Sequence, residues 1–182
     1  ISAPNEDFFR NSIIRGNHIH HTYNEFQDGV WNLEGESTIV LESNNQNITL
    51  EDNYLHDAPH GFSIKGGMNP PFIVRRNIII NTSEGFRQNC IYNAPAYSAG
   101  QAEIYENIFY NFYDMGIHLH NAVFAPCASS GGDEIRNVRI YNNAFYQGTG
   151  AGGAIVLAPS NNAGSYYNIN NVSSYNNIFL NV

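Results

Sequence analysis

Three basic side chains in the middle of the chain have the types that proton-transfer chemistry needs. Lys65 ends the segment GFSIK, Arg87 follows EGF, and His120 lies in GIHLHN. A β-elimination requires a base that removes the proton next to a carboxylate and a cation that stabilises the resulting enolate. We therefore take Lys65 and Arg87 as candidates for base and stabiliser, with His120 as a third candidate catalytic group.

The alternation of apolar and polar residues predicts which side chains share a face. In GIHLHN, Ile117 and Leu119 are expected to point inward, so His118 and His120 point outward. The same alternation directs Ser63 and Lys65 outward in GFSIKGG, and it directs Asn32 and Glu34 outward in GVWNLEG. Stacked in register, these strands would place their outward side chains in one stripe along the outer face. Its predicted members are Glu34, Lys65, a residue near Arg87–Gln88 and His120, and the candidate substrate-binding residues are Glu34 and His118.

Other interpretations of the same residues are simpler. Lys65 could pair with Glu34 across neighbouring segments, an exposed contact worth about 0–1 kcal/mol. His118 and His120 alternate as metal-binding pairs do, but no third ligand of matching kind is evident, so no metal site is predicted there or at His18, His20 and His21. Acid hydrolysis needs two carboxylates on one face, and the sequence singles out no such pair. We interpret His56-Asp57 as a corner element.

A repeated unit must position these groups. Six similar segments centre on asparagines, with steps of 36, 24, 30, 36 and 34 residues between them: Asn17, Asn53, Asn77, Asn107, Asn143 and Asn177. A second motif follows each of the first five and starts at Gly29, Gly61, Asn89, Gly116 and Gly153. Recurrence on this scale is typical of solenoids, propellers and arrays.

Each unit holds two or three short strands and no stretch with helical periodicity. Variable unit length is easy to accommodate in loops at the corners of a coil, whereas a propeller blade needs four strands at even spacing. We therefore predict an all-β parallel solenoid of about six coils, stacked roughly 4.8 Å apart. The turn asparagines should tolerate the left-handed conformation and bond along the axis. The inward candidates in the second unit are Ile48, Leu50, Leu55, Phe62 and Ile64.

Together, the asparagine-turn and glycine-strand motifs of residues 13–182 resemble the repeat of pectate lyase-like proteins. The resemblance implies a single-stranded, right-handed parallel β-helix. Lys65 followed one coil later by Arg87 is similar to the arrangement in chondroitinase B-type and alginate lyase-type enzymes. Those enzymes carry a carboxylate cluster for calcium before the lysine, whereas HGFSI has none, and here Gln88 replaces the basic residue that follows their arginine. The resemblance implies a polysaccharide lyase rather than a hydrolase, with calcium as a possible cofactor although no cofactor is evident in the sequence.

Composition narrows the class of partner. The 182 residues suit a single domain, and only 13% of them are charged, with a net charge of −8. No basic patch exists, so we expect no nucleic acid partner. The sequence contains no apolar run of 18 residues, so we expect no membrane span. A surface of Asn, Ser, Thr and Tyr suits sugars or neighbouring protein copies. We expect a secreted or cell-surface protein.

Two further features fit that location. Cys90 and Cys127 are the only cysteines, and a disulfide between neighbouring coils is geometrically reasonable. Sequons at Asn47, Asn81 and Asn171 permit glycosylation.

Two functions follow as alternatives. The first is a β-helix that binds or cleaves polysaccharide along its outer stripe. The second is a structural fibre, sheath or surface subunit whose coils stack end to end. No capping helix is evident at the C-terminus, so we expect open ends, and residues 1–182 to be one domain that is a section of a longer solenoid or a self-stacking unit.

Overall fold

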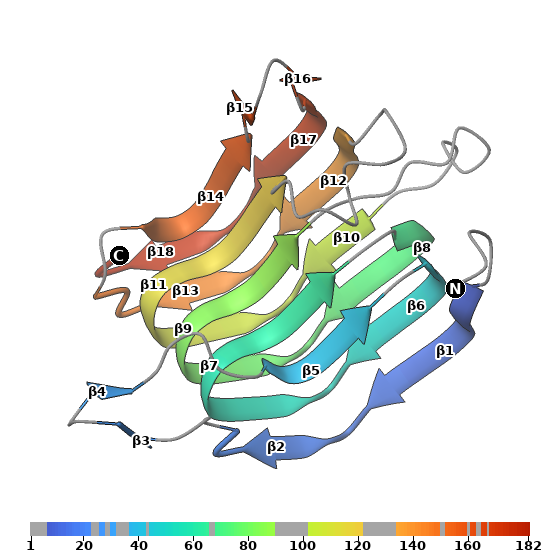
Figure 1. The fold of residues 1–182 in the computed structure, drawn as a ribbon. Coiled ribbons are helices and arrows are strands. Elements are labelled where there is room, and N and C mark those ends of the chain that lie inside the picture. The colour runs from blue at the N-terminus through green and yellow to red at the C-terminus, as the bar shows by residue number, and fades with distance from the viewer. Residues whose placement is uncertain are drawn as a thin grey trace.

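The computed structural model winds the chain into a parallel β-helix, as Figure 1 shows. The structure describes residues 7–22, 26–27, 30–31, 37–42, 44–65, 68–89, 102–121, 134–149, 152–159, 161–162, 165–166 and 168–182. Regular structure in these ranges consists entirely of strands, so no helix among them is long and apolar enough to cross a membrane. The predicted all-β solenoid of six stacked coils is confirmed.

Two parallel sheets face each other across the core. The first contains, in spatial order, β1 (Asp7–Arg15), β6 (Asn44–Glu51), β8 (Met68–Arg75), β10 (Ala102–Tyr105), β12 (Glu134–Tyr141) and β17 (Asn168–Tyr175). The second contains β2 (His18–His20), β7 (Tyr54–Lys65), β9 (Ile78–Asn89), β11 (Ile108–Asn121), β13 (Ala144–Tyr146) and β18 (Ile178–Leu180). In addition, β5 (Ser37–Glu42) pairs with β7, and β14 (Gly153–Pro159) pairs with β11. The chain alternates between the sheets, and each alternation closes one coil.

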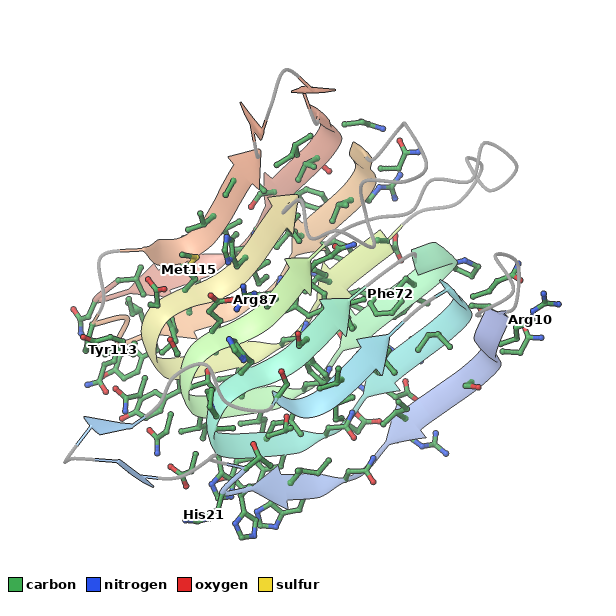
Figure 2. All side chains as sticks on the ribbon, viewed as in Figure 1. Arg10, His21, Phe72, Arg87, Tyr113 and Met115 are labelled. Atoms are coloured by element: carbon green, nitrogen blue, oxygen red, sulfur yellow. The ribbon has the colours of Figure 1, made fainter. Side chains whose placement is uncertain are left out.

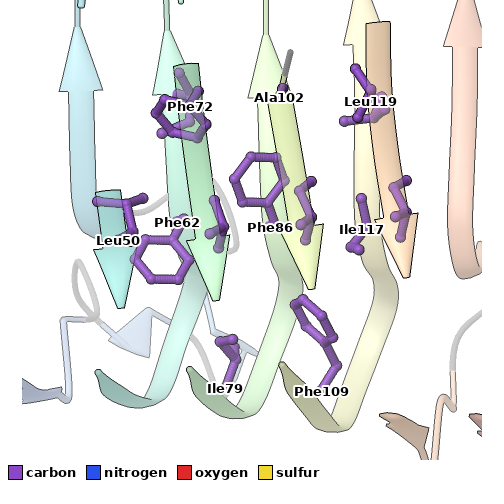
Figure 3. Packing of buried hydrophobic residues seen from close by; sticks show 14 of the residues in the cluster. Leu50, Phe62, Phe72, Ile79, Phe86, Ala102, Phe109, Ile117 and Leu119 are labelled. Atoms are coloured by element: carbon purple, nitrogen blue, oxygen red, sulfur yellow. The ribbon is translucent and has the colours of Figure 1, made fainter. Parts of the chain in front are cut away.

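Apolar side chains from both sheets fill the space between them (Figure 3). The five predicted inward residues of the second coil are confirmed, since each is at most 1% exposed: Ile48, Leu50, Leu55, Phe62 and Ile64. Equivalent positions stack along the axis. The rings of Phe109 and Phe145 lie 4.9 Å apart and almost parallel, and Phe179 continues the stack at 5.2 Å.

The six predicted asparagines form a continuous hydrogen-bonded line, the asparagine ladder: Asn17, Asn53, Asn77, Asn107, Asn143 and Asn177. At each step the backbone N–H and the side-chain Nδ2 of one asparagine both donate to Oδ1 of the next. For Asn77 and Asn107 these distances are 3.0 and 2.9 Å. Nδ2 of Asn77 also donates to the carbonyl of Leu50, one coil back. The ladder thus satisfies the buried polar groups of each turn, which is why asparagine recurs there.

The left-handed conformation belongs to a different residue from the one expected. The ladder asparagines are not left-handed; the residue before each of them is, as at Asp52 (φ 55°) and Arg76 (φ 53°). A second left-handed corner follows four residues after each ladder position, for example at Asp57 and Asn81. The ladder residue itself is therefore selected for its side-chain amide, and the corner residues for their backbone.

The first coil differs from the prediction. GVWNLEG does not supply its second strand, because β4 (Val30–Trp31) pairs antiparallel with β3 (Phe26–Gln27). β5 takes that place instead, with Ile39 and Leu41 buried beside Phe62 and Ile64. The long insertion after the first ladder asparagine displaces the strand along the sequence. A second small hairpin joins β15 (Asn161–Asn162) and β16 (Ser165–Tyr166).

The glycine motif of the third coil starts at Gly85 and not at Asn89. Phe86 pairs with Phe62 on one side and with Ile117 on the other, which aligns Gly85 with Gly61 and Gly116. A Cβ on Gly85 would lie 2.4 Å from Cδ1 of Phe109, and one on Gly61 would lie 2.4 Å from the carbonyl oxygen of Gly85. Glycine is therefore required at this corner because successive coils approach too closely for a side chain.

Candidate functional site

Four polar side chains meet where the second sheet bends around Gly85. They are His60 on β7, Glu84 and Arg87 on β9, and His118 on β11, and we call them the Glu84 cluster. Register places His60 beside Glu84 and Arg87 beside His118. Figure 2 shows Arg87 on β9, in the middle strands of the molecule. Three consecutive coils thus contribute to one group of side chains.

The Glu84 carboxylate lies at the centre of the cluster. His118 Nδ1 lies 3.3 Å from its Oε2 atom, and Arg87 Nε lies 3.5 Å from the same oxygen. Burial by itself would raise the pKa of this carboxyl, but the hydrogen bond from His118 and the charge of Arg87 outweigh it, so the pKa falls below its ordinary value. Glu84 is therefore ionised at neutral pH and accepts hydrogen bonds from its neighbours.

Arg87 joins the carboxylate to a second imidazole. Its Nη1 atom lies 3.1 Å from Nε2 of His60. A guanidinium can only donate, so Nε2 of His60 is the acceptor in this contact and the ring proton is on Nδ1. The position of the guanidinium is thus fixed from two strands.

The tautomer of His118 follows from its contact with Glu84. A hydrogen bond from Nδ1–H to Glu84 leaves the lone pair of the neutral ring on Nε2, the atom that a general base uses. A carboxylate that orients an imidazole, next to a permanent cation, is the combination that proton abstraction requires. The cluster can therefore supply both a base and a charge stabiliser.

A second buried carboxylate provides a contrast. Glu51, at the end of β6, is held by Arg75 at 2.7 Å, Arg76 at 2.9 Å and Arg15 at 3.3 Å. Its pKa is lowered, chiefly by the hydrogen bond from Arg75 and against the effect of burial. All three partners are permanent cations, so this group holds coils together but offers no proton to exchange near neutral pH.

The residues of the predicted stripe lie in two rows, where a row is a line of residues in register across neighbouring strands. Lys65 is in register with Glu42 on one side and Asn89 on the other, and Asn89 is in register with His120. Arg87 lies in the neighbouring row, between Ser63 and His118. The position that belongs between Lys65 and His120 is therefore Asn89, one or two residues after the predicted Arg87–Gln88.

Two facing predictions also need correction. Ser63 and His118 were expected on an exposed outer face, but only 2% of Ser63 and 7% of His118 is exposed. Alternation predicts the direction of a side chain and not what packs over it. Gln88 points inward, between Ile64 and Leu119, and is 1% exposed.

Glu84 and His60 are not among the site residues predicted from the sequence, although the sequence contains a signal for both. His60-Gly61-Phe62 and Glu84-Gly85-Phe86 share a Gly-Phe pair eight residues after a ladder asparagine. Aligning these pairs would have placed the carboxylate beside the imidazole. The candidate residues Glu34, Cys90 and Cys127 lie outside the described residues, so neither their contacts nor the proposed disulfide can be placed.

The sequon asparagines lie at exposed left-handed corners and bond to their neighbours along the axis. Nδ2 of Asn47 donates to Asn11 at 2.7 Å, that of Asn81 to Asp57 at 2.8 Å, and that of Asn171 to Asn137 at 2.6 Å. The structure therefore gives these three asparagines a role in holding coils together. Their glycosylation stays a prediction.

Comparison with known proteins yields no relative: no family model, curated protein or solved structure matches the chain. Within the ranges that the structure describes, no group of three or more His, Cys, Asp or Glu side chains is arranged to hold a metal ion. The function is therefore inferred from the geometry of the described side chains.

Proposed function

We propose that this protein is a secreted β-helix that binds an acidic polysaccharide along the outward side of β7, β9 and β11 and cleaves it by β-elimination. The observation that carries the proposal is the Glu84 cluster, in which a buried carboxylate orients one imidazole beside a guanidinium. The resemblance of the repeat to pectate lyase-like proteins supports the same reaction class. A lyase fits better than a hydrolase, because the cluster, as the described residues form it, contains one carboxylate, whereas acid hydrolysis uses two.

Each residue has a distinct role in this proposal. Arg87, whose side chain is 25% exposed, would meet the uronate carboxylate first and stabilise the enolate. His118, oriented by Glu84, would remove the proton. Lys65 and His120, in the row of residues adjacent to Arg87 and His118, are the candidates for a second base, for the acid that gives a proton to the glycosidic oxygen as the carbon–oxygen bond breaks and the double bond forms, and for substrate contacts. The proposal assigns no step to calcium; in the described residues no group of three or more His, Cys, Asp or Glu side chains could hold a metal ion.

The direct test is the appearance of unsaturated uronate products, which absorb in the ultraviolet. The parent protein is incubated with alginate, pectate and glycosaminoglycans, and absorbance is followed over time. With the accepted substrate, Arg87→Gln and His118→Gln should each reduce the rate at least about 100-fold, the scale expected when a base or a charge stabiliser is removed.

Arg139→Gln is the matched control. Arg139 is exposed on the first sheet and pairs with Glu103 at 3.6 Å, so its loss removes a surface ion pair but leaves the second sheet unchanged. The control should retain the parent rate. If the parent forms no product from any of these polysaccharides and binds none in a pull-down on insoluble substrate, the proposal is wrong.

A structural subunit whose coils stack end to end is the second candidate function. Ile178, Phe179 and Leu180 of β18 are about half exposed, and the ring of Phe179 extends the Phe109–Phe145 stack to the edge of the described chain. Filaments with an axial repeat of about 29 Å in electron micrographs, six coils at 4.8 Å, would support stacking. A monodisperse monomer at high concentration would contradict it.

A further inference from the structure

We propose that a group of histidines at the edge of the second sheet binds a divalent transition-metal ion of the class that imidazole prefers, such as nickel, copper or zinc. The histidine cluster consists of His18, His20, His21 and His56. The first two lie on β2, His21 follows at a left-handed corner, and His56 lies on β7. Figure 2 shows His21 beside β2 at the edge of the molecule, away from Arg87.

The separation of two ring nitrogens carries the argument. Nε2 of His18 lies 2.8 Å from Nε2 of His56, so the two rings share a hydrogen bond when no metal is bound. Two imidazole nitrogens that bind one ion at about 2.0–2.1 Å, at the right angles of the square-planar sites typical of Cu²⁺ and Ni²⁺, are about 2.9 Å apart. The two rings are thus already close to the separation of a chelate that links the first coil to the second.

Asp57 directs the lone pair of His56 toward His18. Its Oδ2 atom lies 2.6 Å from Nδ1 of His56, and a carboxylate can only accept, so Nδ1 carries the proton and Nε2 the lone pair. A carboxylate behind a histidine in this way orients metal ligands and strengthens them as donors. Asp57 is fixed in turn by Nδ2 of Asn81 at 2.8 Å.

Two more imidazoles lie within reach of this pair. The His20 ring stacks on that of His56 with centroids 4.9 Å apart, and Nδ1 of His20 contacts Nδ1 of His21. In the described residues no three such side chains form a ready-made site, so we propose a two-imidazole chelate. Water, or His20 and His21 after a ring rotation, would complete the coordination; exposed side chains rotate within nanoseconds.

The repeat itself shows that the fold does not demand these histidines. The positions equivalent to His18 hold Tyr54, Ile78, Ile108, Ala144 and Ile178 in the other coils. Those equivalent to His20 and His56 hold Ile80, Tyr110, Tyr146 and Leu180. Apolar and aromatic side chains thus serve the solenoid equally well. Histidines on two neighbouring coils therefore call for an explanation other than packing.

Titration calorimetry with Ni²⁺, on the whole chain purified without a polyhistidine tag, tests the proposal. The parent should show saturable one-to-one binding and a higher Tm with Ni²⁺. His18→Gln and His56→Gln should each weaken binding at least tenfold. Asp57→Asn, which keeps every imidazole, should weaken it about tenfold, as loss of a group that orients a ligand does. The control His118→Gln removes an imidazole elsewhere and should bind like the parent.

Two results would overturn the proposal. One is the absence of saturable Ni²⁺ binding by the parent. The other is parent-like affinity in both His18→Gln and His56→Gln, which would place the ion elsewhere. His18 is the more exposed of the two, so its replacement should disturb the fold less. If His56→Gln has a lower Tm than the parent in the absence of metal, the Ni²⁺ affinity of His18→Gln alone decides whether the ion binds at this site. None of these outcomes depends on polysaccharide cleavage.

Discussion

The asparagine ladder and the Glu84 cluster are both polar and largely buried, yet they differ in how they use the repeat. The ladder places the same residue in every coil, and each amide is fully used by its neighbours. In the Glu84 cluster, matching positions of successive coils hold different residues, and the solenoid requires none of these residues. In this molecule, repeated polar residues hold the coils together, while polar residues that break the repeat are the candidates for chemistry.

Removing one rung of the ladder should have the largest effect. Asn107→Leu leaves the N–H and Nδ2 of Asn77, and the carbonyl of Val74, without their partner inside the protein. Buried groups left in this way cost about 1–3 kcal/mol each, so we expect the free energy of unfolding to fall by roughly 3–5 kcal/mol in urea denaturation. Asn111→Gly removes a single exposed bond at a left-handed corner and should cost less than about 1 kcal/mol. Equal losses in the two variants would contradict the role of the ladder.

Gly85→Ala tests the corner on which the Glu84 cluster is built. The added methyl group meets Phe109 and the carbonyl of Gly116, so overpacking should cost about 1–3 kcal/mol by thermal unfolding. At Gly16 a methyl group meets no atom within 4 Å, and only its left-handed backbone (φ 68°) opposes alanine. Gly16→Ala should therefore cost about 1 kcal/mol. A Gly85→Ala variant as stable as the parent would show that the coils can separate at this corner.

A low pH should weaken the Glu84 cluster but not the asparagine ladder, because the ladder contains no titratable group. The pKa of Glu84 is below its ordinary value of 4.5 in the folded protein, so its stabilising effect is complete above that value and is lost as the pH falls through the folded pKa. We expect the Tm of the parent to decline in this range, and Glu84→Gln to decline less steeply. Identical slopes in the two proteins would mean that Glu84 gains nothing from His118 and Arg87.

Gln88 is a buried polar residue that belongs to neither group, and its replacement should have the smallest effect. Its Nε2 atom has no hydrogen-bond partner among the described residues, and its neighbours in the row are Ile64 and Leu119. Gln88→Leu should therefore raise the free energy of unfolding by about 1 kcal/mol. A loss of stability instead would indicate that an ordered water pairs with the amide.

Much of the fold could be predicted from local patterns. The ladder asparagines, the strands around them and the inward residues of the second coil follow from side-chain chemistry and alternation within a few residues. The candidate site was harder, because it depends on which residues of different coils become neighbours. The glycine motif lies eight residues after Asn53 and Asn77 but nine after Asn107, and the first coil contains a long insertion.

The sequence by itself therefore determined the solenoid, since each turn needs an amide that bonds along the axis and each strand needs alternating apolar residues. Only the tertiary structure decided the register between coils. That register placed Arg87 beside His118 rather than beside Lys65, brought His56 to His18, and covered side chains that alternation had predicted to be exposed. The physical reason is that hydrogen bonds between strands fix the alignment of the coils. The number of residues between coils varies, so this alignment cannot be counted off along the sequence.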